Sequence, residues 1–288
     1  MDQRIIDLYD EYTHKPLDRR QFLDRLAKLT GSMAVALSLV PLLEASKAAA
    51  AIVPEDDARL RTETVSFPAA EGDLSGYLVL PAEASGPLPG VVVVHENRGL
   101  NPHIRDIARR VALAGYVALA PDFLSSLGGT PEDEDKARDM IGQLDQARTT
   151  ENARQAVSWL RGREETTDRV GAMGFCWGGG VIGRLAVAEP DLDAGVVFYG
   201  PAPDPAQVSR IRAPLLLHYA GLDERINSGI PAFRQALDQA GVTYQLYMYE
   251  GANHAFNNDT SEARFDPQAA ELAWQRTLAF LEETLKSA

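Results

Sequence analysis

The sequence predicts a doubly wound α/β fold, in which helices cover both faces of a mostly parallel β-sheet. Short apolar runs alternate with helical patterns along most of the chain. The run Val91–Val94 is apolar and β-branched throughout, which is typical of a central strand covered on both faces. Candidate catalytic side chains follow several predicted strands, where open parallel sheets bind their ligands. These observations indicate a single α/β catalytic domain.

The length and composition of the chain are sufficient for one large α/β domain and an additional segment. The chain has 288 residues, of which 45% are hydrophobic and 24% are charged, so it can bury a large core. The formal net charge of −13 argues against nucleic acid or an anionic membrane surface as a partner. No internal repeat or low-complexity tract divides the chain, and we expect one domain over residues 52–288.

Residues 1–51 differ from the remainder and are predicted to be a leader. Asp18–Leu23 resembles a twin-arginine export signal, Met33–Leu43 is apolar and uncharged, and Ala48–Ala51 offers small-residue cleavage sites. Eleven apolar residues are too few to cross a bilayer of about 30 Å as a helix. We therefore expect the export machinery as a partner, a periplasmic or other extracytoplasmic location, and no stable membrane anchoring after leader removal. The alternative is an amphipathic helix that docks on the domain of a cytoplasmic protein.

Beyond the leader, each element is predicted from its periodicity. The stretches Thr62–Phe67 and Leu74–Leu80 predict an antiparallel hairpin. Short apolar runs predict further strands at Val91–Val94, Tyr116–Ala120, Arg169–Met173, Ala194–Tyr199, Pro214–Tyr219 and Thr243–Tyr249. Helical patterns cover Ile104–Ala114, Pro131–Ala147, Glu151–Arg161, Val181–Ala188, Ile230–Ala240 and Ala269–Leu285.

The stretch Gly174–Gly180 lies between a predicted strand and a predicted helix and carries Cys176 at its centre. A nucleophile on such a sharp turn needs small residues two positions before and after it, and glycine occupies both. The amides at the start of the following helix favour a thiolate. The alternative is a small buried hydrophobic residue, which is common for free cysteine. The context favours a nucleophile, and the chain has no second cysteine for a disulfide.

Asp223 and His254 complete a predicted catalytic triad with Cys176. Their order along the chain is nucleophile, acid, histidine, with room between them for further strands and helices. His254 would take the thiol proton and later activate water, and Asp223 would orient the imidazole. Asp223 could instead be a turn residue, His95 is the competing histidine, and Asp259 lies too near His254 in sequence to be placed.

Backbone amides are predicted to form the oxyanion hole. The candidates are the amide of Trp177, directly after the nucleophile, and that of Asn97, in the loop after Val94. No metal site is predicted, because no cluster of histidine, cysteine and acidic residues shows the spacing of metal ligands.

Four motifs together resemble the dienelactone hydrolase family, from about Val65 to Leu285. They are Gly-Phe-Cys-Trp-Gly-Gly around Cys176, His-Glu-Asn-Arg-Gly from His95, Gly-Leu-Asp ending at Asp223, and Asn-His-Ala-Phe around His254. Val92–Asn101 and the leader look most like the exported-type members. The resemblance implies an α/β-hydrolase fold and hydrolysis of small-molecule esters or lactones through an acyl-cysteine, without metal or organic cofactor.

The resemblance also implies roles for residues around the nucleophile. Glu96 matches a family glutamate that contacts the resting cysteine, although it could instead be an exposed loop carboxylate. Two arginines that hold a substrate carboxylate in the archetypal enzyme correspond to Ser126 and Asn258, so the expected clamp is missing. Arg98 and Arg225 lie near the site in sequence and could substitute, or could be surface residues.

Three other functions remain open at this point. The scissile bond could be a thioester or another activated acyl bond. Cys176 could work as a redox thiol, although no resolving cysteine is present. The fold could also be retained for ligand binding. The sequence makes no prediction of oligomeric state.

Overall fold

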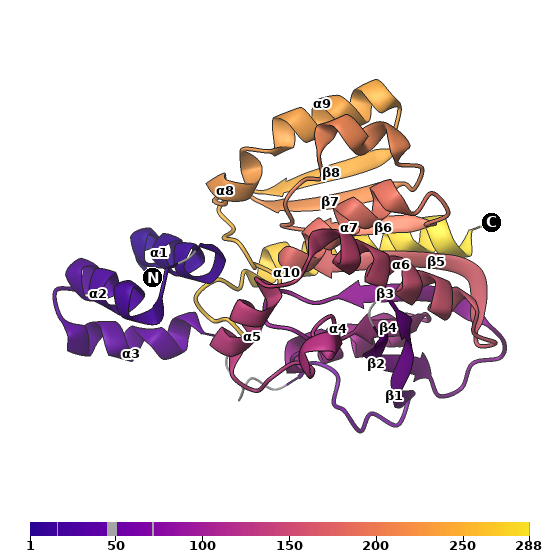
Figure 1. Cartoon of the computed structure of the whole chain (residues 1–288), viewed down its shortest axis with the longest axis horizontal. Helices are drawn as coiled ribbons and strands as arrows, with labels where there is room; N and C mark the ends of the chain where they lie inside the picture. The colour runs from indigo at the N-terminus through magenta and orange to yellow at the C-terminus, as the bar shows by residue number, and fades with distance from the viewer. Residues whose placement is uncertain (16, 45–50, 71, 288) are drawn as a thin grey trace.

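The computed structural model describes residues 1–15, 17–44, 51–70 and 72–287. Within these residues, eight strands form one sheet in the order β1-β2-β4-β3-β5-β6-β7-β8 (Figure 1). The strands are β1 (Leu60–Ala69), β2 (Gly72–Pro81), β3 (Leu88–Val94), β4 (Val117–Pro121), β5 (Thr166–Phe175), β6 (Ala194–Phe198), β7 (Leu215–Ala220) and β8 (Tyr244–Tyr249).

The sheet is parallel from β4 to β8 and antiparallel only where β1, β2 and β4 pair. Val94 at the end of β3 lies opposite Gly174 near the end of β5, so the loops after these strands meet at one edge of the sheet. This arrangement confirms the predicted fold class and the predicted amino-terminal hairpin.

Helices cover both faces of the sheet. Val92 and Val94 share a buried cluster with side chains of α6, α7 and α9, whereas Val91 and Val93 share one with α4 and α10. The β-branched run is therefore buried on both sides, as its composition predicts. The helices after the sheet begins are α4 (Pro102–Leu113), α5 (Glu134–Ile141), α6 (Gln146–Arg161), α7 (Trp177–Ala188), α8 (Glu224–Asn227), α9 (Ile230–Ala240) and α10 (Pro267–Leu281).

The boundary between α5 and α6 differs from the prediction. Helices were expected over 131–147 and 151–161, but α5 ends at Ile141 and α6 begins at Gln146. The reason is local capping, because the Asp145 side chain accepts a hydrogen bond from the Arg148 amide and starts a helix there. The predicted boundary at 147–151 was wrong.

Within residues 1–15 and 17–44, three helices fold against the catalytic domain. They are α1 (Gln3–His14), α2 (Arg19–Thr30) and α3 (Met33–Leu43), and their apolar side chains form a buried cluster of their own. Figure 1 shows this bundle beside α5, at the end of the sheet where the parallel strands finish. We call helices α1–α3 the cap.

The cap lies within the predicted leader, residues 1–51. Of the helices that the structure describes, none alone is long and apolar enough to cross a membrane. Only α2 and α3 taken together reach that length and composition, and the pair is bent by 113°. Most of the expected cleavage region, residues 48–50, lies outside the described residues. Leader removal therefore stays a prediction.

Candidate active site

Cys176 lies on a sharp turn between β5 and α7. Its backbone has φ 54° and ψ −115°, a conformation that non-glycine residues rarely adopt. A Cβ on Gly174 would lie 2.4 Å from the carbonyl oxygen of Gly178, and one on Gly178 would lie 2.5 Å from that of His95. Glycine is therefore required on both sides of the turn, and the loop after β3 lies directly against it.

His254 and Asp223 form a buried pair beside this turn. His254 Nδ1 lies 2.5 Å from Asp223 Oδ2, and both residues follow neighbouring strands of the sheet. Asp223 also caps α8 by accepting a hydrogen bond from the Ile226 amide. Nδ1 carries the proton of the hydrogen bond that it donates to Asp223, so Nε2 of neutral His254 is an acceptor. This Nε2 has no hydrogen-bond partner within the described residues.

The hydrogen bond to Cys176 comes from a residue that was not predicted. His14, the last residue of α1, places Nε2 at 3.1 Å from Cys176 Sγ. The nearest ligand atoms of His14, Cys176 and His254 all lie within 4.8 Å of one another. Sequence reasoning set His14 aside as part of the leader, and a separation of 162 residues from Cys176 gave no signal of contact.

Asp10 holds the His14 ring in place. Nδ1 of His14 donates to the Asp10 carbonyl oxygen at 2.9 Å, and Oδ1 of Asp10 lies 3.1 Å away. Burial lowers the pKa of His14, but attraction to Cys176 and the bonds to Asp10 and Cys176 outweigh it and raise this pKa. Burial raises the pKa of Asp10, but nearby His254, His14 and Arg225 outweigh it and hold this pKa well below its usual range.

Glu96 and Asn258 also lie in the site, but they bond to each other. Asn258 Nδ2 donates to Glu96 Oε2 at 2.8 Å, and the Tyr199 hydroxyl donates to Glu96 Oε1 at 3.4 Å. Glu96 is buried, so the alternative of an exposed loop carboxylate was wrong. Within the described residues, the hydrogen-bond partner of the Cys176 sulfur is His14 and not Glu96.

Ser126 is a candidate residue that lies outside the site around Cys176. It is exposed in a 3-10 turn, Ser125–Leu127, and lines neither of the cavities that contain Cys176. The structure therefore gives no support to the tentative assignment of Ser126 to substrate binding. The turn after β4 points this side chain into solvent.

Arg98 and Arg225 are both engaged by carboxylates. Arg98 is buried and donates to Asp135 Oδ1 at 3.2 Å and to the Glu134 carbonyl oxygen at 2.7 Å. Arg225 Nε donates to Asp10 Oδ2 at 3.2 Å, and its Nη2 lies 3.5 Å from His254 Nδ1. Arg98 is therefore not a surface residue, whereas Arg225 is exposed but paired with Asp10.

The competing assignments find other partners. His95 Nδ1 bonds the Glu96 carbonyl oxygen, and its Nε2 accepts from the Phe123 amide, so neither ring nitrogen faces the thiol. Asp259 pairs with His103 at 3.0 Å and with Arg110, and is not bonded to His254.

The predicted oxyanion-hole residues flank the nucleophile. Trp177 is the first residue of α7, so its amide is one of the unpaired donors at a helix start. Its ring stacks on His95 with centroids 5.2 Å apart. Asn97 lies in the loop after β3, and its side chain donates to the Thr13 carbonyl oxygen of the cap at 2.8 Å.

Two cavities meet at Cys176. An open cleft of about 710 Å³ is lined by residues that include His14, Cys176, Trp177 and Tyr199, which is room for a small molecule. A small cavity of about 20 Å³ lies on the other side of His14, and Arg264 is among its lining residues. Arg264 was not predicted, because its place depends on the cap, where it lies over the Tyr9 ring.

His14, Cys176 and His254 are also the residues that could hold a metal. Two imidazole nitrogens and one thiolate are ligands that Zn²⁺ accepts, and Asp10 and Asp223 would support the imidazoles from behind. The sequence gave no sign of this group because His14 lies far from the other two along the chain. Measurements of thiol reactivity should therefore include a chelator.

The sheet, the strained turn and the residues at the strand ends define an α/β-hydrolase. Residues 74–285 match the dienelactone hydrolase family, and the chain belongs to this family. Its activity class is accordingly that of a hydrolase of carboxylic esters or lactones. Residues 1–31 match a second family, described as YqhI-like.

Individual relatives agree with this assignment. An Escherichia coli K12 protein that carries the name carboxymethylenebutenolidase is 30% identical over 253 residues, covering 83% of this chain and 93% of the relative. The hydrolase fragment YghX of the same strain is 53% identical over 112 residues, which is 38% of this chain and 96% of the fragment. A crystal structure named as a dienelactone hydrolase from Klebsiella pneumoniae has a TM-score of 0.71 at 30% identity, covering 78% of this chain and 99% of that one.

Proposed function

We propose that the protein hydrolyses an ester or lactone bond of a small molecule through an acyl-cysteine intermediate. Cys176 is the nucleophile, His254 the general base for water, and Asp223 the residue that orients His254. One observation carries the proposal: His254, whose Nδ1 faces Asp223, offers a ring nitrogen within 4.8 Å of a sulfur on a strained strand-to-helix turn.

In the first half of the reaction, the Cys176 thiolate attacks the substrate carbonyl carbon. The oxyanion lies at the start of α7, where the Trp177 amide and the Asn97 amide are the proposed donors. The carbon–oxygen bond to the leaving group then breaks, and the leaving oxygen takes a proton from an imidazolium. The product of this half is a thioester on Cys176.

In the second half, His254 Nε2 takes a proton from water while the water oxygen attacks the thioester carbon. The carbon–sulfur bond breaks, the acid is released, and the sulfur leaves as thiolate. Asp223 holds Nδ1 and offsets the positive charge that His254 gains. The sum of both halves is ester plus water giving acid plus alcohol.

Three of the positions expected to recognise a substrate carboxylate, Ser126, Asn258 and Arg98, favour a neutral substrate. Ser126 lies outside the site, Asn258 bonds Glu96, and Arg98 is paired with Asp135. No charge-assisted bond to a substrate carboxylate is therefore offered by these positions. We expect a neutral lactone and an activated aryl ester to be hydrolysed at least as fast as dienelactone, measured by kcat/KM on purified full-length protein.

Acyl-enzyme trapping tests the mechanism directly. Full-length protein is mixed with an activated aryl ester, quenched in acid within the first turnovers, and analysed by intact mass and peptide mapping. Because Cys176 is the only cysteine of the chain, a thioester adduct has a single possible position. We expect one acyl group on Cys176. Turnover without any such adduct in the wild type and in a His254→Ala variant would contradict the acyl-cysteine route.

Comparing the hydrolysis of esters, lactones and thioesters also distinguishes the alternative functions. Rapid hydrolysis of thioesters with slow hydrolysis of esters would assign the same machinery to another acyl bond. Failure to hydrolyse any acyl compound, together with reversible oxidation of Cys176, would favour a redox thiol or a binding protein.

Export of the protein is a separate proposal. It rests on the twin-arginine-like stretch Asp18–Leu23 and the apolar stretch Met33–Leu43. Cell fractionation with intact-mass measurement tests it. A chain in the extracytoplasmic fraction that begins near residue 51 would support export with cleavage. A full-length cytoplasmic chain would support the alternative, a helical segment that docks on its own domain.

A further inference from the structure

The cap delivers a side chain to the reacting sulfur. His14, the last residue of α1, contacts Cys176 Sγ through its Nε2 atom at 3.1 Å. His14 is nearly buried, with 12% of its side chain exposed, and its ring meets that of His254 edge-on with centroids 4.7 Å apart. The nucleophile therefore lies between two imidazoles, one from the cap and one from the catalytic domain.

Each imidazole has its own carboxylate. His254 Nδ1 faces Asp223, and His14 Nδ1 faces the carbonyl and carboxylate oxygens of Asp10. A proton on Nδ1 leaves Nε2 of the neutral ring as an acceptor, so both rings present an acceptor toward the sulfur. Only His14 is within hydrogen-bond distance of it in the described residues.

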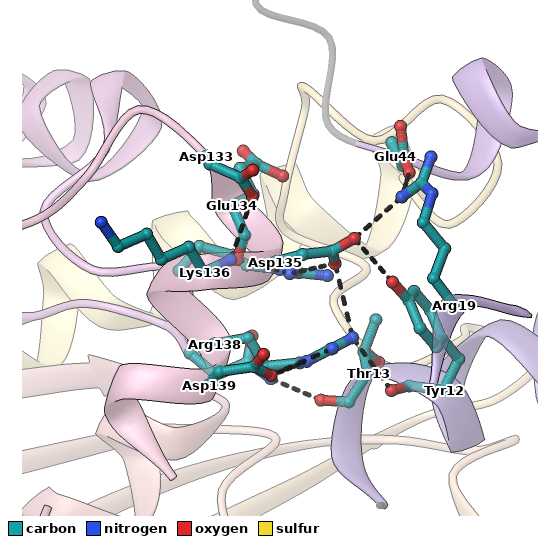
Figure 2. Close-up of polar contacts among 12 residues, drawn as sticks. Tyr12, Thr13, Arg19, Glu44, Asp133, Glu134, Asp135, Lys136, Arg138 and Asp139 are labelled. Carbon is teal, nitrogen blue, oxygen red and sulfur yellow. Dashed lines mark hydrogen bonds and ion pairs between the residues drawn. The ribbon is translucent and has the colours of Figure 1, made fainter. Parts of the chain in front are cut away.

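Polar contacts fix the cap on the domain around this point. The Tyr12 hydroxyl donates to Asp135 Oδ2 at 2.6 Å, and Arg138 Nη1 donates to the Tyr12 carbonyl oxygen at 3.3 Å (Figure 2). Gln3 Nε2 donates to Asn253 Oδ1 at 2.6 Å, next to His254 in the chain. These bonds lie on both sides of His14, so its position does not depend on one contact.

We propose that His14 is a catalytic residue of this site: its Nε2, at 3.1 Å from Cys176 Sγ, passes a proton between the sulfur and the leaving oxygen. The proposal rests on the acyl-cysteine mechanism given above. It divides the work of the two imidazoles, because His14 serves acylation and His254 serves deacylation.

Distance favours His14 over His254 as the residue that exchanges a proton with the sulfur. His14 Nε2 lies 3.1 Å from Cys176 Sγ, whereas His254 Nε2 has no hydrogen-bond partner within the described residues. Asp223 and Arg225 both face His254 Nδ1, and Asp10 faces His14 Nδ1. The other charged side chains that line the two cavities at Cys176 are Lys15, Glu96, Arg98, Glu134, Arg138, Asp139 and Arg264.

The proton balance closes over one turnover. The thiol proton moves from Sγ to Nε2 of His14, which gives a thiolate and an imidazolium. After attack, the leaving oxygen takes this proton and His14 becomes neutral. In deacylation His254 takes a proton from water and the sulfur departs as thiolate. The proton on His254 then passes by way of this sulfur to His14. The acid product loses its own proton to solvent.

The rate of alkylation by iodoacetamide reports the thiolate without any turnover. It is measured against pH on chelator-treated full-length protein, for wild type, His14→Ala, His14→Gln, His254→Ala and Lys15→Ala. Lys15→Ala is the matched control, since it removes a positive charge next to His14 and leaves the His14–Cys176 pair in place. Circular dichroism and thermal melting show whether each variant is folded.

We expect both His14 variants to be alkylated about tenfold more slowly than wild type near neutral pH, with the profile shifted to higher pH. His254→Ala and Lys15→Ala should keep the reactivity of wild type at low pH. Rapid-quench experiments should show slow acylation in the His14 variants and accumulated acyl-enzyme in His254→Ala.

Three results would overturn the proposal. One is a wild-type alkylation profile in both His14 variants. Another is full recovery in His14→Gln alone, because glutamine can donate a hydrogen bond but cannot carry the proton. The third is an active form of the protein from cells that begins after residue 44. None of these results depends on whether an acyl-cysteine forms, which the trapping experiment decides separately.

Discussion

Replacing Cys176 by alanine is expected to lower kcat for ester and lactone hydrolysis by roughly 10⁴-fold or more. Alanine keeps the Cβ and removes only the sulfur, so the backbone conformation of the turn should survive. The residual rate would come from the oxyanion hole and from substrate binding. Steady-state kinetics with the neutral lactone and the aryl ester provide the measurement.

Folding of the variant has to be checked alongside its rate. Loss of one buried sulfur atom should cost about 1 kcal/mol of stability, which a thermal melt will register as a small shift. A folded Cys176→Ala protein that hydrolyses esters at the wild-type rate would exclude Cys176 as the nucleophile. The hydroxyl of Cys176→Ser offers a further comparison, because an alcohol at this position depends more heavily on a base than a thiol does.

His254→Ala should have a comparably large effect on turnover but should act on a different step. Without His254 Nε2 there is no base for water, so the thioester on Cys176 should persist and kcat should fall by about 10⁴-fold or more. Asp223→Asn should cost about 10³- to 10⁴-fold, because it removes the charge that holds Nδ1 and stabilises the imidazolium. Burst kinetics show which step is slowed in His254→Ala. The burst of alcohol release from acylation should remain, while the steady-state rate, which needs deacylation, should fall.

Asp259→Asn is the matched control for Asp223→Asn. Asp259 is also a carboxylate bonded to a histidine, His103, but this pair is not bonded to the nucleophile or to His254. We expect its effect to be one of stability alone, with kcat close to wild type. Equal losses in the Asp223 and Asp259 variants would indicate a general folding defect and would remove the support for Asp223.

Most of the catalytic domain was predictable from local pattern. The β-branched run Val91–Val94 has a core on each side, and the glycines around Cys176 fit contacts that no side chain could replace. The pairing of Asp223 with His254 was predictable because residues at the carboxyl ends of parallel strands must gather at one edge of the sheet. These are properties of short segments and of fold geometry, and a sequence displays both.

The cap could not be found in the same way. Its contacts with the domain are long-range pairs, such as Tyr12 with Asp135, that no spacing reveals. Asp18 and Gln21 form a capping box that starts α2, and the same letters resemble an export signal. The same residues therefore fit both a helix start and an export signal. Because the export signal was preferred, His14 was not considered as a site residue. Ser126 was misplaced because the turn after β4 decides where it points.

The contacts of Arg19 have a consequence for recognition of the twin-arginine-like stretch by an export receptor. Its guanidinium bonds Asp135 of α5 at 2.8 Å and Glu44 at 2.9 Å, while Arg20 beside it is exposed. A transport receptor that recognises paired arginines must compete with these two carboxylates for the first of the pair. Docking of the cap thus pairs the first arginine with two carboxylates, although 51% of its side chain stays exposed. For the export proposed above, we therefore expect docking of the cap to compete with recognition of the arginine pair.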